Sequence, residues 1–192
     1  MRMQNKFIRR IVYDGMLISL YVVLSTLGIR FPQPINITIT FASVATTMAA
    51  LVFGPADAFL IGLLGEFLAQ FMKYGITLTT PIWILPPAIR GLLIGIVAVL
   101  FRGKGKDLMD RKALALITML AVSIITSFVN TAAMATDAAV YQYSYVFLAV
   151  STPIRFASGL ATATLVWLVA MPLYKAIRKV LPVENRENTP AS

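Results

Sequence analysis

The chain has 192 residues, of which 58% are hydrophobic and 13% are charged, and its formal net charge is +9. A soluble domain carries about 25% charged residues, so this composition indicates an integral membrane protein. The chain contains no Cys and no His, which excludes thiolate and imidazole metal sites, a cysteine nucleophile and a histidine general base.

Six apolar stretches follow one another along the chain, without the alternation that is typical of a membrane β-barrel. A helix needs about 20 residues to cross a membrane, and the third stretch is shorter than that. The second stretch is rich in threonine, so we expect neighbouring helices to shield both. The first stretch has a basic flank but no cleavage site after it, which favours a retained helix over a signal peptide. The stretches are residues 11–29, 35–53, 58–73, 82–101, 113–136 and 146–174.

The fold class predicted from these stretches is an all-α membrane protein with six transmembrane helices. We expect residues 1–181 to form a single six-helix transmembrane domain. Residues 182–192 are mostly polar and contain two prolines, a composition typical of a disordered cytoplasmic tail.

Most of the 17 basic residues are expected on one side of this bundle. Six crossings bring three segments to the same side: the one before the first helix, the one between the fourth and fifth, and the one after the sixth. The positive-inside rule makes that side cytoplasmic, so both termini are predicted to be cytoplasmic. The positive charge then reflects topology and does not indicate a nucleic-acid partner. The residues are Arg2, Lys6, Arg9, Arg10, Arg102, Lys104, Lys106, Arg111, Lys112, Lys175, Arg178, Lys179 and Arg186.

Four polar residues on four different predicted helices fall at a similar depth in the outer half of the membrane: Glu66, Arg90, Asn130 and Arg155. The two arginines lie about 12 Å deep when each helical residue is counted as 1.5 Å. A charge at such a depth costs roughly 2.5–3.5 kcal/mol, so it should face the bundle interior or water. In one interpretation, Glu66 pairs with an arginine and only locks two helices together. One glutamate cannot neutralise two arginines, so the surplus favours a carboxylate-bearing ligand.

Aromatic residues near the predicted outer loops are candidates for the wall of this binding site. Many of them fit the aromatic belt found at membrane interfaces. Trp83 and Tyr74 are the two that we assign to the ligand, since Trp83 precedes Pro86 and Pro87 on the same segment as Arg90. These prolines either begin the fourth helix or break it.

Small residues four positions apart allow two helices to approach closely. Gly15 and Ser19 have this spacing in the first helix, and Gly91 and Gly95 have it in the fourth.

Asp14 follows Arg10 by four residues. On a helix this spacing predicts an ion pair between the two near the cytoplasmic boundary.

The basic segment 102–109 (RGKGKDLM) lacks the glycine spacing and the hydroxyl residue of a phosphate-binding loop. We therefore do not expect ATP hydrolysis by a P-loop mechanism in this chain.

Two sequence motifs resemble the substrate-binding (S) component of energy-coupling factor (ECF) transporters, which import vitamins into prokaryotes. They are FGPADAFLIGLLGE at residues 53–66 and PPAIRGLLIG at residues 86–95. The similarity extends over nearly the whole chain, to about residue 180. The family's A-x-x-x-A pattern reads Gly15 to Ser19 here, and its G-P-x-x-G pattern contains an Asp57 that the family does not explain.

The resemblance implies a binding protein in the prokaryotic cell membrane that is neither an enzyme nor dependent on a cofactor. Such proteins bind a vitamin in a pocket in the outer half of the membrane. They dock onto a transmembrane coupling subunit of the EcfT type, which carries two ATPase subunits of the EcfA type, and topple to release the vitamin inside. The resemblance makes Gly15 and Ser19 the candidate docking residues, and it places Glu66, Arg90, Asn130 and Arg155 in the expected pocket.

The substrate predicted from the charges is a carboxylate vitamin, since two arginines face one glutamate. Pantothenate is the expected vitamin and folate is the next candidate.

Two other functional classes stay open at this point. An ion-coupled secondary transporter would carry out uptake without partners. A membrane-embedded enzyme would depend on Glu66, Asp57 or Asp137, of which only Glu66 belongs to the predicted polar layer.

Overall fold

A computed structural model describes residues 2–31, 37–142 and 144–180 of the chain. The predicted tail, residues 182–192, lies outside the described residues. The elements in chain order are α1 (Arg2–Thr26), β1 (Ile29–Phe31), β2 (Ile37–Ile39), α2 (Ala42–Val52), α3 (Pro55–Tyr74), α4 (Thr80–Trp83), α5 (Leu85–Arg102), the 3-10 turn η1 (Leu108–Asp110), α6 (Lys112–Tyr141) and α7 (Tyr145–Val180).

The described chain contains four helical segments long and apolar enough to cross a membrane: α3, the segment made by α4 and α5, α6 and α7. Helix α2 is apolar but has only 11 residues. Helix α1 has 25 residues, and its first half carries the basic flank. The predicted six-helix membrane fold is therefore confirmed, with α4 and α5 in place of the predicted fourth helix.

Helices α4 and α5 are separated at Ile84, which ends the first and precedes the second. Pro86 and Pro87 stand in the first turn of α5, where a missing backbone N–H costs no helical hydrogen bond. Of the two alternatives for this proline pair, the start of a helix is the correct one.

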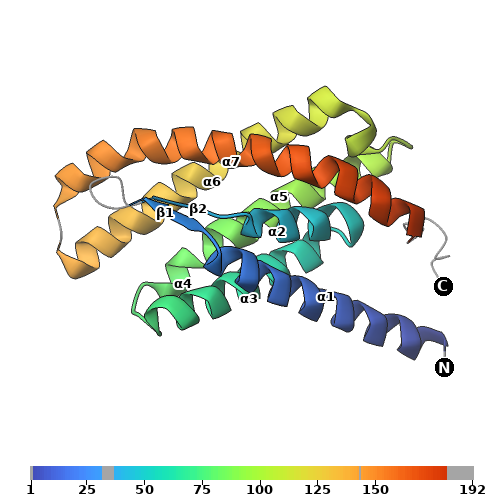
Figure 1. The fold of residues 1–192 in the computed structure, drawn as a ribbon, viewed down its shortest axis with the longest axis horizontal. Helices are drawn as coiled ribbons and strands as arrows, with labels where there is room; N and C mark the ends of the chain where they lie inside the picture. The colour runs from blue at the N-terminus through green and yellow to red at the C-terminus, as the bar shows by residue number, and fades with distance from the viewer. Residues whose placement is uncertain (1, 32–36, 143, 181–192) are drawn as a thin grey trace.

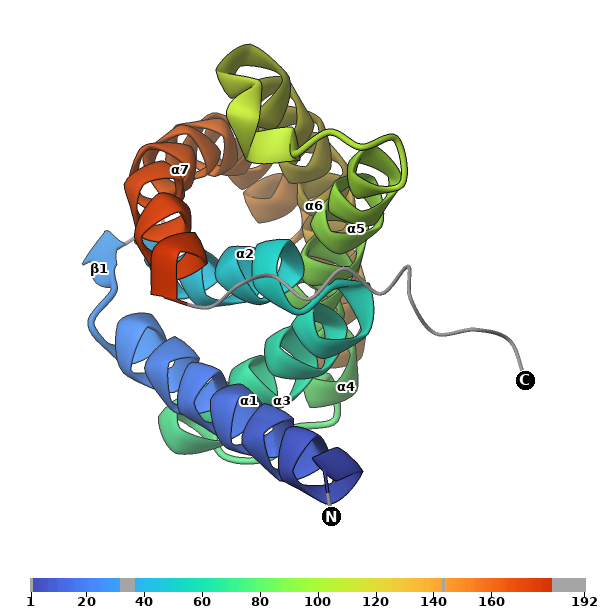
Figure 2. The same cartoon turned by 90° about the vertical axis from the view of Figure 1, so that its right-hand side faces the viewer.

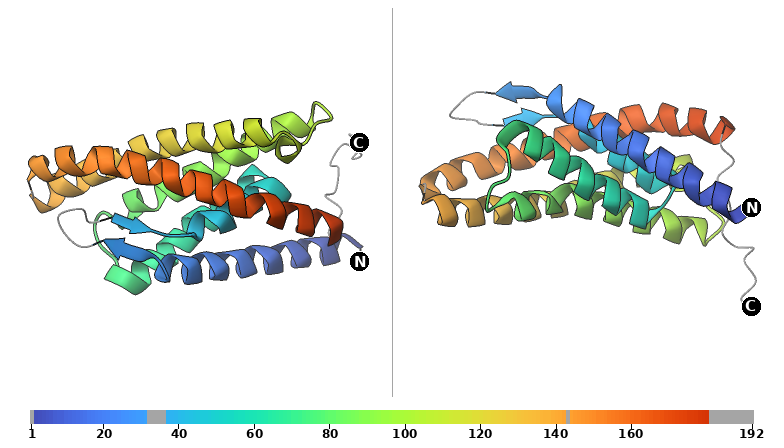
Figure 3. Two further views of the ribbon diagram at one scale, coloured as in Figure 1. Left: turned by 45° about the horizontal axis from the view of Figure 1, so that its top comes forward. Right: turned by 90° about the horizontal axis from the view of Figure 1, so that it is seen from below.

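A small antiparallel hairpin of β1 and β2 precedes α2, with Ile29 opposite Ile39 and Phe31 opposite Ile37. The prediction of one continuous helix over residues 35–53 was wrong in this part. The segment Ile37–Ile39 consists of β-branched residues, which favour strands over helices. The hairpin and α4 lie away from the end of the bundle where both α1 begins and α7 ends (Figures 1 and 3).

Helix α2 lies near the centre of the bundle, where Figure 2 shows it between α1, α3, α5 and α7. Each residue from Ala42 to Leu51 is buried. Alanine, serine and threonine dominate this helix, and their small side chains let helices approach it from several sides. The threonine-rich stretch is shielded by its neighbours, as predicted.

Helices α3 and α5 are in backbone contact because glycines line their interface. A Cβ atom added to Gly91 would lie 2.5 Å from the carbonyl oxygen of Ala58, and one added to Gly95 would lie 2.5 Å from the Cα of Pro55. On the other side of the interface, a Cβ at Gly62 would meet backbone atoms of α5 at 2.6 Å. The close approach predicted for Gly91 and Gly95 is confirmed, and the two family-like motifs are the two sides of one helix contact.

Arg10 of α1 forms an ion pair with Asp57 in the first turn of α3. The Arg10 Nε also donates to Asp57 Oδ1 over 3.0 Å. The predicted pair of Arg10 with Asp14 was wrong, since no ion pair joins these two residues in the described chain. Asp57, which the family pattern left unexplained, thus fastens α3 to α1.

The connection between α5 and α6 is tied to the end of α7. Asp107 accepts a hydrogen bond of 2.6 Å from the Tyr174 hydroxyl and forms an ion pair of 2.9 Å with Arg178. These contacts bring two of the three basic segments together near the end of the bundle where α1 begins (Figure 1). The positive-inside rule assigns this end to the cytoplasm.

Candidate functional site

A cavity of about 850 Å³ lies in the half of the bundle opposite the termini. Helices α1 and α3 to α7 contribute to its wall, together with the start of α2. All six residues predicted to bind the ligand line it: Glu66, Tyr74, Trp83, Arg90, Asn130 and Arg155.

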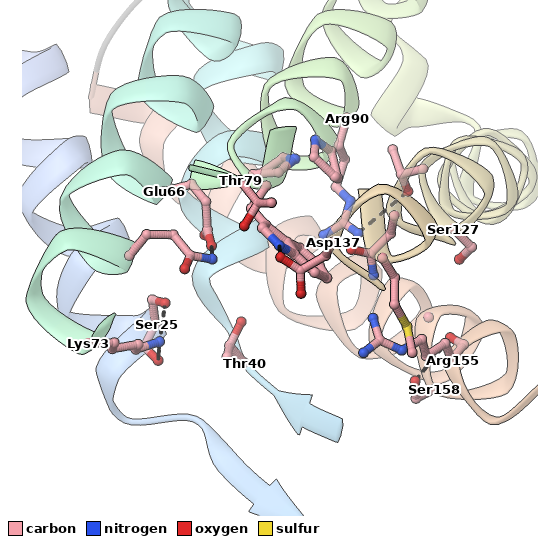
Figure 4. A pocket seen from close by; sticks show the side chains of 18 of the residues that line it. Ser25, Thr40, Glu66, Lys73, Thr79, Arg90, Ser127, Asp137, Arg155 and Ser158 are labelled. Atoms are coloured by element: carbon pink, nitrogen blue, oxygen red, sulfur yellow. Dashed lines mark hydrogen bonds between the residues drawn. The ribbon is translucent and has the colours of Figure 1, made fainter. Parts of the chain in front are cut away.

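Arg90 stands one turn after the start of α5 and projects between the wall that carries Glu66 and the wall that carries Arg155 (Figure 4). Among the described residues, its guanidinium makes one hydrogen bond, from Nη2 to the Thr126 hydroxyl over 3.5 Å. That hydroxyl itself donates to main-chain carbonyls of α6, including Val122 O at 3.0 Å. A guanidinium has five N–H donors, so most of those of Arg90 are available to a ligand.

Glu66 is held by two neutral donors. Its carboxylate accepts a hydrogen bond of 2.6 Å from the Tyr21 hydroxyl and one of 2.9 Å from Gln70 Nε2. No ion pair joins Glu66 to an arginine in the described part of the chain. The interpretation that Glu66 only locks two helices through an arginine therefore finds no support in these contacts.

Trp83 is fixed across the cavity by α6. Its indole Nε1 donates to Asp137 Oδ1 over 3.3 Å, and both residues line the cavity. The predicted polar layer did not include Asp137. In the structure α6 extends to Tyr141, and Asp137 lies in the cavity wall.

Lys73 also lines the cavity. Its ammonium group donates to the hydroxyl and to the main-chain carbonyl of Ser25, both over 2.8 Å. The charged residues of the cavity wall are therefore Lys73, Arg90 and Arg155 against Glu66 and Asp137. The wall keeps the predicted surplus of positive charge, but it contains one more basic and one more acidic residue than predicted.

Hydroxyl residues complete the wall, and sequence reasoning missed most of them. On α7, Ser158 and Thr162 follow Arg155 at helical spacing, a signal that the sequence contained. Thr40 lies between β2 and α2, and Thr79 lies in the connection between α3 and α4, so no periodicity could have found them.

Gly15 and Ser19, the predicted docking residues, lie on the exposed face of α1. A Cβ atom on Gly15 would meet nothing within 4 Å among the residues that the structure describes. The Ser19 hydroxyl donates to the Gly15 carbonyl over 2.9 Å. Neither residue lines the cavity.

Helices of membrane-spanning length around a ligand-sized polar cavity define a multi-pass membrane protein with a binding pocket. The family model described as "ECF-type riboflavin transporter, S component" matches residues 5–179. The chain belongs to this family, and it is an S component of the ECF type in the cell membrane.

The chain also has relatives of similar sequence among bacterial proteins. The chain is 30% identical over 99 residues to the UPF0397 protein of Streptococcus agalactiae serotype Ia, covering 50% of this chain and 52% of that protein. It is 32% identical over 94 residues to the UPF0397 protein of Lactococcus lactis subsp. cremoris strain MG1363, covering 48% and 50%. The aligned region thus spans about half the length of these curated relatives.

Two solved structures share the fold. The first is the S component of a bacterial ECF transporter, with a TM-score of 0.67, 16% identity, and coverage of 92% of this chain and 98% of that one. The second is the S component for biotin from an ECF-type ABC transporter, with a TM-score of 0.62, 15% identity, and coverage of 89% and 93%. At these identities the likeness concerns the fold alone.

Proposed function

We propose that the chain is the vitamin-binding subunit of an ECF-type importer and that its vitamin carries a carboxylate, with pantothenate as the favoured cargo. The vitamin enters the cavity from the outer side. The loaded subunit docks through α1, at Gly15 and Ser19, onto a coupling subunit of the EcfT type that carries two EcfA-type ATPases. It then topples to release the vitamin inside.

The choice of an anionic vitamin rests on the hydrogen bonding of the Arg90 guanidinium. Its guanidinium reaches a cavity inside the membrane with one long hydrogen bond among the described residues, 3.5 Å to Thr126. Buried polar groups without partners are costly, so a ligand acceptor at this position is strongly stabilised. A carboxylate matches the planar fork of a guanidinium and can accept two of its N–H bonds.

Two other charged groups of the cavity wall are already bound within the protein. Lys73 is bound to Ser25, and Glu66 accepts from Tyr21 and Gln70. The two carboxylates of the wall disfavour a second negative charge on the ligand. A vitamin with one carboxylate, hydroxyls and an amide, such as pantothenate, fits this balance better than a dianion such as folate.

Riboflavin is the second candidate cargo, because the matching family model is described as a riboflavin transporter component. The cavity of about 850 Å³ is near the upper end of the roughly 300–1,000 Å³ that is usual for small-molecule pockets. Trp83 and Tyr74 would offer ring faces to a flavin. Riboflavin has no carboxylate, so Arg90 would pair with a carboxylate of pantothenate but not of riboflavin.

Calorimetric titration of the purified chain in detergent, without ATP, tests the proposal. Pantothenate, riboflavin, folate, biotin, thiamine and pyridoxine are titrated separately. We expect sub-micromolar binding of pantothenate and weaker or no binding of the others. Tight binding of riboflavin instead would replace the cargo and keep the binding function. If protein that is shown to be folded binds none of these six compounds, the proposal is contradicted.

Liposomes that contain the chain alone separate this function from the alternative classes. An S component without partners binds its vitamin but does not accumulate it. Gradient-driven uptake by the chain alone would establish an ion-coupled transporter, and turnover of the vitamin would establish an enzyme.

A further inference from the structure

A second and smaller cavity lies against the inner side of Arg90. Its volume is about 20 Å³, and we call it the inner chamber. It shares Arg90, Ser43, Gly159 and Thr162 with the large cavity, so the guanidinium stands at the boundary between the two. The remaining lining residues are Thr47, Ile94, Met119, Ser123, Ala163 and Val166.

Three hydroxyl groups in the inner chamber have no hydrogen-bond partner in the described chain: those of Ser43, Thr47 and Ser123. The three residues are only 6%, 1% and 3% exposed. Ser43 and Thr47 are one turn apart on α2, and Ser123 comes from α6. A buried hydroxyl without a partner is destabilising, so three converging on one small cavity indicate a bound polar guest.

Neighbouring hydroxyls show that the local helices offer an alternative. Thr46 donates to a carbonyl of its own helix over 3.1 Å, and Thr126 does so over 3.0 Å. Such internal bonds are the usual solution for Ser and Thr within a helix. Ser43, Thr47 and Ser123 do not adopt this solution, which leaves all three hydroxyl groups for the chamber.

The size and charge of the inner chamber favour a water molecule as the bound species. One water molecule needs roughly 10–15 Å³ and two to four polar partners, and the chamber offers about 20 Å³ and three hydroxyls. The positive charge of Arg90 disfavours a cation. Apart from Thr162, whose hydroxyl donates to the Ser158 carbonyl of its own helix over 2.8 Å, the rest of the wall is apolar and includes Ile94, Met119 and Val166.

We propose that the inner chamber is a structural water site, in which one water molecule is bound by Ser43, Thr47, Ser123 and the inner side of Arg90. This water holds the guanidinium so that its other N–H groups face the large cavity. The second part of the inference rests on the proposed function, since it makes Thr47 and Ser123 positioning residues for ligand binding through Arg90.

A crystal structure of the vitamin-free protein, at a resolution that shows ordered water, tests the site itself. We expect one density peak within hydrogen-bond distance of the three hydroxyls. Crystals soaked in bromide should show no anomalous peak there. Absence of the density peak, or a bromide peak in its place, would overturn the water site, and the bromide peak would identify an anion site. This experiment does not depend on which vitamin binds.

Paired variants test the positioning role. Thr47→Val and Ser123→Ala together remove two partners of the water, whereas Thr47→Ser keeps the hydroxyl and is the control. We expect the double variant to weaken binding of pantothenate about fivefold, which corresponds to roughly 1 kcal/mol. Binding of the alcohol analogue panthenol, which lacks the carboxylate, should stay unchanged.

The outcomes distinguish the inference from the proposed function. An equal loss of affinity for pantothenate and panthenol would indicate a packing defect and overturn the positioning role, as would wild-type affinity for both. If pantothenate does not bind the wild-type chain, the proposed cargo fails, and the density peak still decides whether the water site exists.

Discussion

Helix α5 presents two neighbouring stripes that behave in opposite ways. Gly91 and Gly95 face α3 and allow the two backbones to touch. Arg90 and Ile94, each one residue earlier, face the cavities. Successive residues of a helix differ by about 100° around its axis, so a single step in sequence separates a dry helix contact from a polar pocket wall.

The difference between the two stripes shows how a short membrane helix can hold a charged side chain in a fixed position. The glycine stripe brings α5 against the α3 backbone, which leaves the helix little freedom to move. The guanidinium on the next stripe is then carried by a rigid support, the arrangement that a preorganised binding site requires. The two stripes therefore differ in what a substitution should change: stability on one side and affinity on the other.

The largest effect is expected for Gly91→Leu. The added Cβ would lie 2.5 Å from the main-chain oxygen of Ala58, and backbone cannot move aside as a flexible side chain can. Overpacking a core costs about 1–3 kcal/mol, so we expect a loss of about 3 kcal/mol in the free energy of unfolding, at the upper end of this range. Thermal unfolding in detergent, followed by size-exclusion chromatography, measures it.

Gly15→Leu is the matched control, because a Cβ at Gly15 meets no atom of the described chain within 4 Å. Its unfolding midpoint should equal that of the wild type. A Gly91→Leu protein as stable as this control would show that α3 and α5 are not held in backbone contact.

On the other stripe, Arg90→Ala should lower vitamin affinity by about ten- to one-hundredfold, since a hydrogen bond to a charged group contributes roughly 1.5–3 kcal/mol. The protein should remain folded, because removing a charge from the membrane interior is not destabilising in itself. Arg90→Lys should recover only part of the affinity, since an ammonium lacks the planar fork.

Arg111→Ala is the control for this series, as Arg111 is an exposed arginine in the connection before α6. Calorimetry should give it wild-type affinity. Wild-type affinity in Arg90→Ala would mean that Arg90 is structural and that the ligand is held elsewhere.

A smaller effect on stability is expected for Asp57→Asn, at the end of the bundle opposite the pocket. Asp57 has a side chain only 5% exposed and pairs with Arg10. Asparagine can still accept one hydrogen bond, so the expected loss is about 1 kcal/mol in the free energy of unfolding, with no change in vitamin affinity.

Asp110→Asn offers a comparison at the same end, since its side chain is 65% exposed and lies 3.8 Å from Arg178. Chemical denaturation should give this variant a free energy of unfolding within about 0.5 kcal/mol of the wild-type value. Equal effects of the two substitutions would contradict the role of Asp57 in fastening α1 to α3.

Much of the fold could be predicted because hydropathy and helical spacing are local properties. The two stripes of α5 were both visible in the sequence, as a charge at membrane depth and as glycines four apart. The same local rules failed for Arg10, which pairs with Asp57 and not with Asp14 one turn away. A partner 47 residues distant is fixed by how α1 and α3 cross, and spacing along one helix contains no information about that.

The candidate site was predicted in part for the same reason. All six residues assigned to the ligand line one cavity, because a charge inside a membrane has few other places to lie. Asp137 was left out because hydropathy marks the apolar middle of a helix and not its polar end, so α6 was expected to finish too early. The hydroxyls of Ser43, Thr47 and Ser123 converge only once α2 packs inside the bundle, which no single segment reveals.

Gly15→Leu should have the smallest effect on the isolated chain, because the contact between α3 and α5 and the binding pocket should both be unchanged. Its effect should appear only in an assay with the partner subunits. The exposed position of Gly15 nevertheless makes a bulky side chain a barrier to close helix docking. Co-expressed with the coupling subunit and two ATPases, this variant should bind its vitamin with wild-type affinity but co-purify poorly and support little ATP-driven uptake in liposomes. Gly15→Ala, which keeps the residue small, should retain both. Normal co-purification of the leucine variant would place the docking surface elsewhere, whereas reduced affinity would show that α1 and the pocket are coupled within the isolated chain.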